Sequence, residues 1–136
     1  MKIYFAGSIR GGREDQELYG GVIKLLSAYG EVLTEHIGSE KLTNMGETSI
    51  SGSEIYVRDM AWLKAADAVV AEVTYPSLGV GYELAQAEEM GKKIICLYRP
   101  SPERRLSAMI AGNPKFRVVE YSDIDEVSKV FKQYLS

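Results

Sequence analysis

The 136-residue chain is poor in the residues that build disulfides and metal centres, since it has one cysteine, Cys96, and one histidine, His36. One cysteine cannot form an intrachain disulfide or by itself a structural zinc site, and one histidine excludes a histidine cluster. Cys96 stands in the apolar run Lys93–Leu97, which favours a buried small hydrophobe over a reactive thiol. We therefore expect no metal and no cofactor.

Long hydrophobic runs and an excess of positive charge are absent too. No apolar stretch approaches the roughly 18 residues of a membrane-spanning helix, and Lys2 leads directly into a strand-like run rather than a signal peptide. We therefore expect a cytoplasmic protein without a membrane partner. Lys and Arg number 16 against 19 Asp and Glu. Proteins that bind nucleic-acid polymers are usually basic, so we expect no such partner, whereas a small phosphorylated ligand needs only a local cluster of donors.

The segments that are present alternate between short β runs and helical patterns. Apolar residues make up 46% of a chain of one-domain length, enough for one core. The predicted strands are Lys2–Ala6, Glu31–His36, Ala68–Val73, Lys93–Leu97 and Phe116–Tyr121. The predicted helices are Glu14–Tyr29, Glu54–Ala66, Tyr82–Met90, Leu106–Ala111 and Asp123–Leu135, and the polar segment Ile37–Ser53 is predicted to be a long loop. This order predicts a single α/β domain, an open five-stranded parallel sheet with helices on both faces, Rossmann- or flavodoxin-like.

Ligands of such sheets bind at the carboxyl ends of the strands, so the loop after the first strand is a candidate anion site. Its backbone N–H groups, the Ser8 hydroxyl and the Arg10 guanidinium are suited to a phosphate. The loop is neither a Walker A motif nor G-x-G-x-x-G, and an ordinary turn with solvated arginines is the alternative. The candidate binding residues are Gly7, Ser8, Ile9, Arg10, Gly11, Gly12 and Arg13.

Two carboxylates are candidates for catalysis. Glu83 follows the predicted loop Thr74–Gly81, in which Gly79 and Gly81 let the backbone approach a ligand. We expect Glu83 in the first turn of the next helix, where the dipole favours its ionised form and could support a nucleophilic role. From the residues alone, plain dipole complementarity is the simpler explanation, because acids are common at this position. Asp59, near apolar Trp62, would have a raised pKa and act as an acid, unless it is a solvated charge. Carboxylates with separated pKa values are typical of glycosyl-bond cleavage.

Two further side chains lie near the expected site. Tyr4 stands three residues before Gly7, and either packs in the core or lies beside a sugar. His36 ends the second predicted strand, at a carboxyl-end position where it could contact a ligand. A lone histidine is more often a structural group.

Six stretches, in order along the chain, resemble the 2'-deoxynucleoside 5'-phosphate N-hydrolases, relatives of the nucleoside 2-deoxyribosyltransferases. The resemblance runs from Ile3 to about Tyr121. The stretches are GSIRGGRED, VLTEH, DMAWLKAADAVVAEVT, PSLGVGYE, ICLYRP and RLSAMI.

The resemblance implies roles that the residues alone leave open. Glu83 matches the nucleophile that attacks the sugar C1', Asp59 the acid that helps the base leave, and Tyr4 a tyrosine beside the deoxyribose. The residues matching those that hold the 5'-phosphate are Ser8, Arg10 and Ser77.

The resemblance also implies a homodimer. Ser107 and Met109 match residues that reach into the neighbouring subunit's site, a role that nothing else in the sequence points to. Three alternatives remain open: a deoxyribosyltransferase that passes the sugar to a second base, a ribonucleotide hydrolase of the CMP-cleaving kind, and a non-catalytic nucleotide-binding module. The predicted phosphate cluster favours a nucleoside monophosphate over a nucleoside, and the presence of both carboxylates argues against a non-catalytic module.

Overall fold

Parallel strands form a five-stranded sheet in the order β2-β1-β3-β4-β5 in the computed structural model, which describes residues 1–9, 15–34 and 50–136. Each neighbouring pair of strands is parallel, which confirms the predicted α/β architecture. The strands are β1 (Lys2–Gly7), β2 (Glu31–Val32), β3 (Ala68–Glu72), β4 (Lys93–Tyr98) and β5 (Arg117–Glu120). The helices are α1 (Gln16–Leu26), α2 (Gly52–Ala65), α3 (Leu78–Glu89), α4 (Ala108–Ala111) and α5 (Ile124–Leu135).

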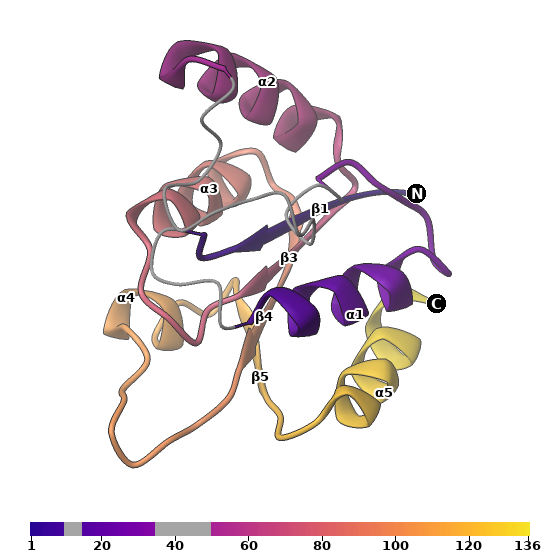
Figure 1. The fold of residues 1–136 in the computed structure, drawn as a ribbon, viewed down its shortest axis with the longest axis vertical. Coiled ribbons are helices and arrows are strands. Elements are labelled where there is room, and N and C mark those ends of the chain that lie inside the picture. Colours follow the sequence, from indigo (N-terminus) through magenta and orange to yellow (C-terminus); the bar gives the residue numbers. More distant parts are fainter. Residues whose placement is uncertain (10–14, 35–49) are drawn as a thin grey trace.

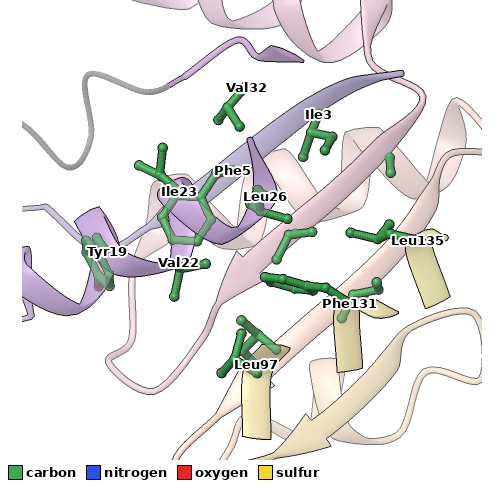
Figure 2. Packing of buried hydrophobic residues seen from close by; sticks show 14 of the residues in the cluster. Ile3, Phe5, Tyr19, Val22, Ile23, Leu26, Val32, Leu97, Phe131 and Leu135 are labelled. Atoms are coloured by element: carbon green, nitrogen blue, oxygen red, sulfur yellow. The ribbon is translucent and has the colours of Figure 1, made fainter. Parts of the chain in front are cut away.

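Helices cover both faces of the sheet, and this explains why the central strands are apolar along their whole length. Helices α1 and α5 lie together over one face, and α2, α3 and α4 lie on the other side (Figure 1). Alternate residues of each strand point to opposite faces. Ile3, Phe5 and Leu97 pack against α1 and α5 (Figure 2), whereas Tyr4 and Ala6 pack on the α2 and α3 side.

Side-chain caps set where α2 and α3 begin. Ser51 Oγ accepts a hydrogen bond from the backbone N–H of Glu54 at 3.1 Å and caps α2. Ser77 Oγ accepts from the N–H of Val80 at 3.2 Å and starts α3 at Leu78. The expected start of this helix at Tyr82 was therefore wrong, because the serine cap overcomes the low helix propensity of two glycines.

The second strand is shorter than predicted, ending at Val32 rather than at His36. The reason is the buried Thr34, whose hydroxyl accepts from the backbone N–H of Phe5 at 2.8 Å and donates to its carbonyl at 2.7 Å. The side chain thus occupies the groups of β1 to which a longer β2 would bond, and residues 35 and 36 lie outside the described part of the chain.

Cys96 is fully buried in β4, as expected, and burial raises the pKa of its thiol to about 12. The thiolate, the reactive form, is thereby suppressed at neutral pH. Among the described residues, no helix has both the length and the apolar character that a membrane crossing requires.

Candidate active site

The point where the strand order reverses lies between β1 and β3. The chain leaves β1 towards α1 on one face and leaves β3 towards α3 on the other (Figure 1). In open parallel sheets, ligands bind at the carboxyl ends of the strands at such a point. Gly7 and Glu72, the last residues of the two strands, lie opposite one another in the register. Ser8 follows β1 and Ser77 caps α3, so both predicted phosphate-holding serines lie on elements that meet at this edge.

Three residues predicted to act together, Tyr4, Asp59 and Glu83, lie close to one another on the α2 and α3 side of the sheet. Tyr4 is 1% exposed in β1, and its hydroxyl hydrogen-bonds the Glu83 carboxyl. Asp59 is near enough to raise the pKa of both Tyr4 and Glu83. Since these residues come from β1, α2 and α3, the cluster exists only in the folded chain.

The protonation of Glu83 differs from the prediction. Glu83 is the sixth residue of α3 rather than part of its first turn, so the helix dipole is weak at its carboxyl. Burial raises the pKa of Glu83 to about 7; the Tyr4 hydrogen bond acts to lower it, and the charge of Asp59 raises it further. The carboxyl that is held partly protonated near neutral pH is therefore Glu83, which the sequence had predicted to be ionised by the dipole.

Asp59 is held by its neighbour in the sequence. The Asp59 carboxylate accepts a hydrogen bond from Arg58 Nε at 2.9 Å, and both side chains are 26% exposed. The Arg58 guanidinium also stacks over the Trp62 ring at 4.7 Å from its centroid. The sequence suggested either a freely solvated charge or a carboxyl isolated against apolar surface, and Asp59 is neither of these.

The first turn of α3 leaves a gap over Gly79. A Cβ at this position would lie 3.8 Å from both Glu83 Oε1 and Ser77 Oγ. A serine hydroxyl and a carboxylate therefore flank a stretch of backbone that no side chain covers at this residue. This arrangement lets a small ligand contact the Ser77 hydroxyl, the Glu83 carboxylate and the Gly79 backbone together. Gly79 lies in a helix, however, and not in the predicted loop.

A second group of predicted residues lines a cavity of about 550 Å³ between α3 and the segment 105–116. Ser77 and Gly81 line it from one side, and Ser107 and Met109 from the other. Ser107 caps the short α4, and the Met109 side chain is 80% exposed. Asp59 and Glu83 do not line this cavity, so Ser77 lies between the carboxylate cluster and the Ser107 region.

The remaining predicted residues come from the loop after β1 and from the second strand. Ile9 packs against the core on the α1 and α5 face, Ser8 is buried, and Gly7 contacts the Tyr19 ring. The predicted positions that lie outside the described residues are Arg10, Gly11, Gly12, Arg13 and His36.

One polar cluster at the same edge of the sheet was not predicted. Glu72, Arg99 and Asp15 interact on the α1 and α5 face, and Tyr121 donates to Glu72. A charged residue ending the otherwise apolar strand Ala68–Glu72 was the signal that could have indicated it. Within the described ranges, no three His, Cys, Asp or Glu side chains gather as ligands for a metal ion.

Known proteins resemble this chain along nearly its whole length. The family model described as nucleoside 2-deoxyribosyltransferase matches residues 3–116. A mouse protein named 5-hydroxymethyl-dUMP N-hydrolase is 52% identical over 97% of this chain and 78% of its own. A protein of the same name from Tetraodon nigroviridis is 51% identical over 100% of this chain and 98% of its own.

A solved structure shares the fold. The CMP N-glycosidase of Clostridium botulinum superposes with a TM-score of 0.72 and 20% identity, covering 98% of this chain and 100% of that one. The match of the family model over most of the chain, together with relatives about half identical to it, shows that the protein belongs to the nucleoside 2-deoxyribosyltransferase family.

Proposed function

We propose that this chain hydrolyses the N-glycosidic bond of 2'-deoxynucleoside 5'-monophosphates, releasing the free base and 2-deoxyribose 5-phosphate. The observation that carries the proposal is the cluster of Tyr4, Asp59 and Glu83 on the α2 and α3 side of the sheet. Relatives about 50% identical that bear the name of such hydrolases support it. Their name makes 5-hydroxymethyl-dUMP the first substrate to test.

In the proposed reaction, Glu83 attacks C1' of the sugar while Asp59 passes a proton from solvent to the departing base. The transition state resembles an oxocarbenium ion, which a nearby carboxylate stabilises. A 2'-deoxy sugar reaches this state more readily, because it has no electron-withdrawing 2'-hydroxyl. The Tyr4 hydroxyl stabilises the ionised form of Glu83, the form that can attack, by hydrogen-bonding to it.

Water completes the reaction in a second displacement. After the base has left, water attacks C1' from the face opposite Glu83 and breaks the sugar–carboxylate bond, so that the configuration at C1' is retained overall. Asp59, ionised again once the base has taken its proton, accepts a proton from the attacking water and returns it to solvent. The acid and the nucleophile are thereby both restored.

The 5'-phosphate would bind at the end of β1 and the start of α3. Ser8, Arg10 and Ser77 are the proposed donors, with Arg10 assigned from the sequence alone. A phosphate held away from C1' contributes binding energy that positions the sugar over Glu83. The position of Ser77, which shares the space over Gly79 with the Glu83 carboxyl, supports this arrangement.

We also propose that the active form is a cytoplasmic homodimer in which Ser107 and Met109 of one subunit complete the site of the other. Two side chains beside the 550 Å³ cavity support a partner there, because Leu78 is 97% and Met109 80% exposed. Apolar side chains grouped in this way are typical of a surface that another protein covers.

The direct test is to incubate the protein with a panel of deoxy- and ribonucleoside monophosphates and their unphosphorylated nucleosides, and to follow free base by chromatography. We expect release from deoxynucleoside monophosphates, with 5-hydroxymethyl-dUMP included. Equal cleavage of unphosphorylated nucleosides would contradict the proposed phosphate site. A new nucleotide formed when a second base is added would instead indicate a deoxyribosyltransferase, and preferred cleavage of CMP a ribonucleotide hydrolase.

A further inference from the structure

A buried carboxylate stands at the end of β3, behind the candidate active site. Glu72 is 1% exposed and points to the α1 and α5 face. Its Oε1 accepts from the backbone N–H of Thr74 at 2.7 Å, and its Oε2 from the Thr74 hydroxyl at 3.0 Å and from the Tyr121 hydroxyl. A buried charge is costly unless it is hydrogen-bonded and paired. These hydrogen bonds from Thr74 and Tyr121 therefore stabilise the Glu72 carboxylate and hold it in one position.

Arg99, the first residue after β4, lies between this carboxylate and a second one. Its Nη2 donates to Asp15, and its Nε lies 3.6 Å from Glu72 Oε2. Its backbone N–H donates to the Thr74 hydroxyl at 3.0 Å. A planar guanidinium can face two carboxylates at once, which the point charge of a lysine does less well.

Asp15 connects this network to the end of β1. It directly precedes α1, and Tyr19, one turn later, packs so closely on Gly7 that a Cβ there would lie 2.9 Å from the ring. The Tyr19 hydroxyl is hydrogen-bonded to the backbone of Ser8. The start of α1 therefore contacts the end of β1 through Tyr19, and it is connected to Glu72 at the end of β3 through the ion pairs of Arg99.

We propose that Arg99 is a positioning residue for the phosphate end of the site: by pairing with Asp15 and Glu72 it fixes the distance between Ser8, after β1, and Ser77, after β3. The inference rests on the proposed function, because it assumes that these serines hold the 5'-phosphate. It assigns no contact between Arg99 and the substrate. The carboxylate cluster of Glu83 and Asp59 lies on the other face of the sheet and is expected to stay intact without Arg99.

The test compares two variants with a matched control. Asp15→Asn removes the charge that pairs with Arg99 but leaves every hydrogen bond to Glu72, and Arg99→Lys keeps the charge but loses the fork. Arg117→Met removes an arginine outside this network: Arg117, at the start of β5, donates to the Tyr134 hydroxyl at 3.1 Å. The Asp15→Asn variant keeps the test informative if a change at Arg99 prevents folding.

Two readouts separate positioning from simple destabilisation. The first is the ratio of kcat/KM for a deoxynucleoside monophosphate to kcat/KM for its nucleoside. We expect both variants to lower this ratio about tenfold or more, because misplacement of a binding group by about 1 Å is enough for such a loss. Cleavage of the nucleoside should stay unchanged, and Arg117→Met should leave both values as in the wild type.

The second readout is the rise in Tm that inorganic phosphate causes, because the added free energy of unfolding depends on the phosphate affinity. We expect it in the wild type and Arg117→Met, and a clearly smaller rise in the two variants. If the wild type showed this rise but hydrolysed no nucleotide, the proposed function would fail while the positioning role was still tested. The role of Arg99 would be overturned if the variants lost kcat/KM equally on both substrates, or if phosphate raised their Tm as much as that of the wild type. A wild type whose Tm does not respond to phosphate would overturn it as well.

Discussion

At the residue scale, Glu83 has an environment that opposes its own ionisation. Burial and the nearby Asp59 raise its pKa to about 7, and the Tyr4 hydroxyl opposes this rise. A nucleophile must be ionised, so a shift of this kind makes its activity depend on pH in the physiological range. The three residues therefore form one coupled unit whose protonation is measurable.

The pH dependence of kcat/KM follows from this coupling. We expect an acid limb with an apparent pKa near 7, below which activity falls as Glu83 becomes protonated. Tyr4→Phe removes the hydrogen bond that lowers the pKa of Glu83, so the limb should move to higher pH. Asp59→Asn removes a negative charge that raises this pKa, so the limb of its residual activity should move to lower pH. Shifts of the two variants in the same direction would contradict the assignment.

The same burial makes Glu83 a cost to stability. Its pKa in the folded protein, about 7, lies above its ordinary value of 4.5, so folding favours the protonated form. The contribution of Glu83 to the free energy of unfolding is then most favourable below about pH 4.5, and it is lost as the pH rises to about 7. Glu83→Gln, which still accepts from Tyr4, should stabilise the protein by up to about 3 kcal/mol at pH 8 and little at pH 4.

Denaturant unfolding at both pH values measures this difference. The control is Glu89→Gln, which removes an exposed carboxylate six residues further along α3. We expect no such pH-dependent gain from that control. A Glu83→Gln protein less stable than the wild type at pH 8 would refute the raised pKa.

At the scale of elements, α3 carries both Ser77, its cap, and Glu83 in its second turn. Gly81 lies inside this helix, where an added methyl group would meet no neighbouring element within 4 Å, while Gly91 follows the helix at a φ of +71°. Gly81→Ala should therefore stabilise the protein by about 0.5–1 kcal/mol, because alanine loses less backbone entropy in a helix. Gly91→Ala should destabilise it by about 1–2 kcal/mol, because a Cβ is strained at this φ.

Thermal unfolding of the two alanine variants gives the comparison. Opposite signs are expected even though the substitutions are chemically identical and lie at the two ends of one helix. If Gly81→Ala were the more destabilising of the two, the first turns of α3 would not be helical, and the predicted loop over Thr74–Gly81 would be the better description.

The boundary of α3 shows how far the sequence predicts this fold. The buried strand Ala68–Glu72 and the helix after it follow from an apolar run and a helical pattern. The start of that helix does not, because two glycines and Pro76 are typical of a loop, and the Ser77 cap that outweighs them depends on local geometry. The strand ending at Val32 is a similar case, since a side chain of Thr34 replaces backbone bonds that the sequence pattern would extend.

The candidate site was predictable in its members more than in its chemistry. Tyr4, Asp59 and Glu83 were selected by residue type and by the family resemblance, but spacing along the chain says nothing about their proximity, which arises from three elements. The protonation of Glu83 depends on burial by those elements and was mispredicted. The Arg99 network was missed because its members come from four strand ends or loops, and each alone is an ordinary polar residue.

At the scale of the whole molecule, the proposed dimer predicts sites built from two chains. Glu83→Ala should be inactive for lack of the nucleophile. Ser107→Arg should be inactive because the larger side chain blocks the partner's site. After subunit exchange, the mixed dimer has one site with a native Glu83 and a native Ser107 of the partner, so we expect part of the activity to return.

Exchange has to be demonstrated first, by co-expression with two different tags and isolation of the mixed dimer. Mixed dimers without activity, or a monomer in sedimentation that is fully active in the assay, would exclude shared sites. Two copies of the Glu83→Ala protein carried through the same exchange are the control for contaminating activity.

Mass spectrometry of the protein after reaction with a slow 2'-fluoro analogue of a deoxynucleoside monophosphate tests the central claim most directly. The electron-withdrawing fluorine slows both displacements, so that the sugar–enzyme intermediate accumulates when the leaving group is good. We predict a 2-fluoro-2-deoxyribose 5-phosphate adduct on the peptide that contains Glu83, absent from Glu83→Gln. An adduct on Asp59, or hydrolysis of the analogue with inverted configuration at C1' and no adduct, would contradict the account.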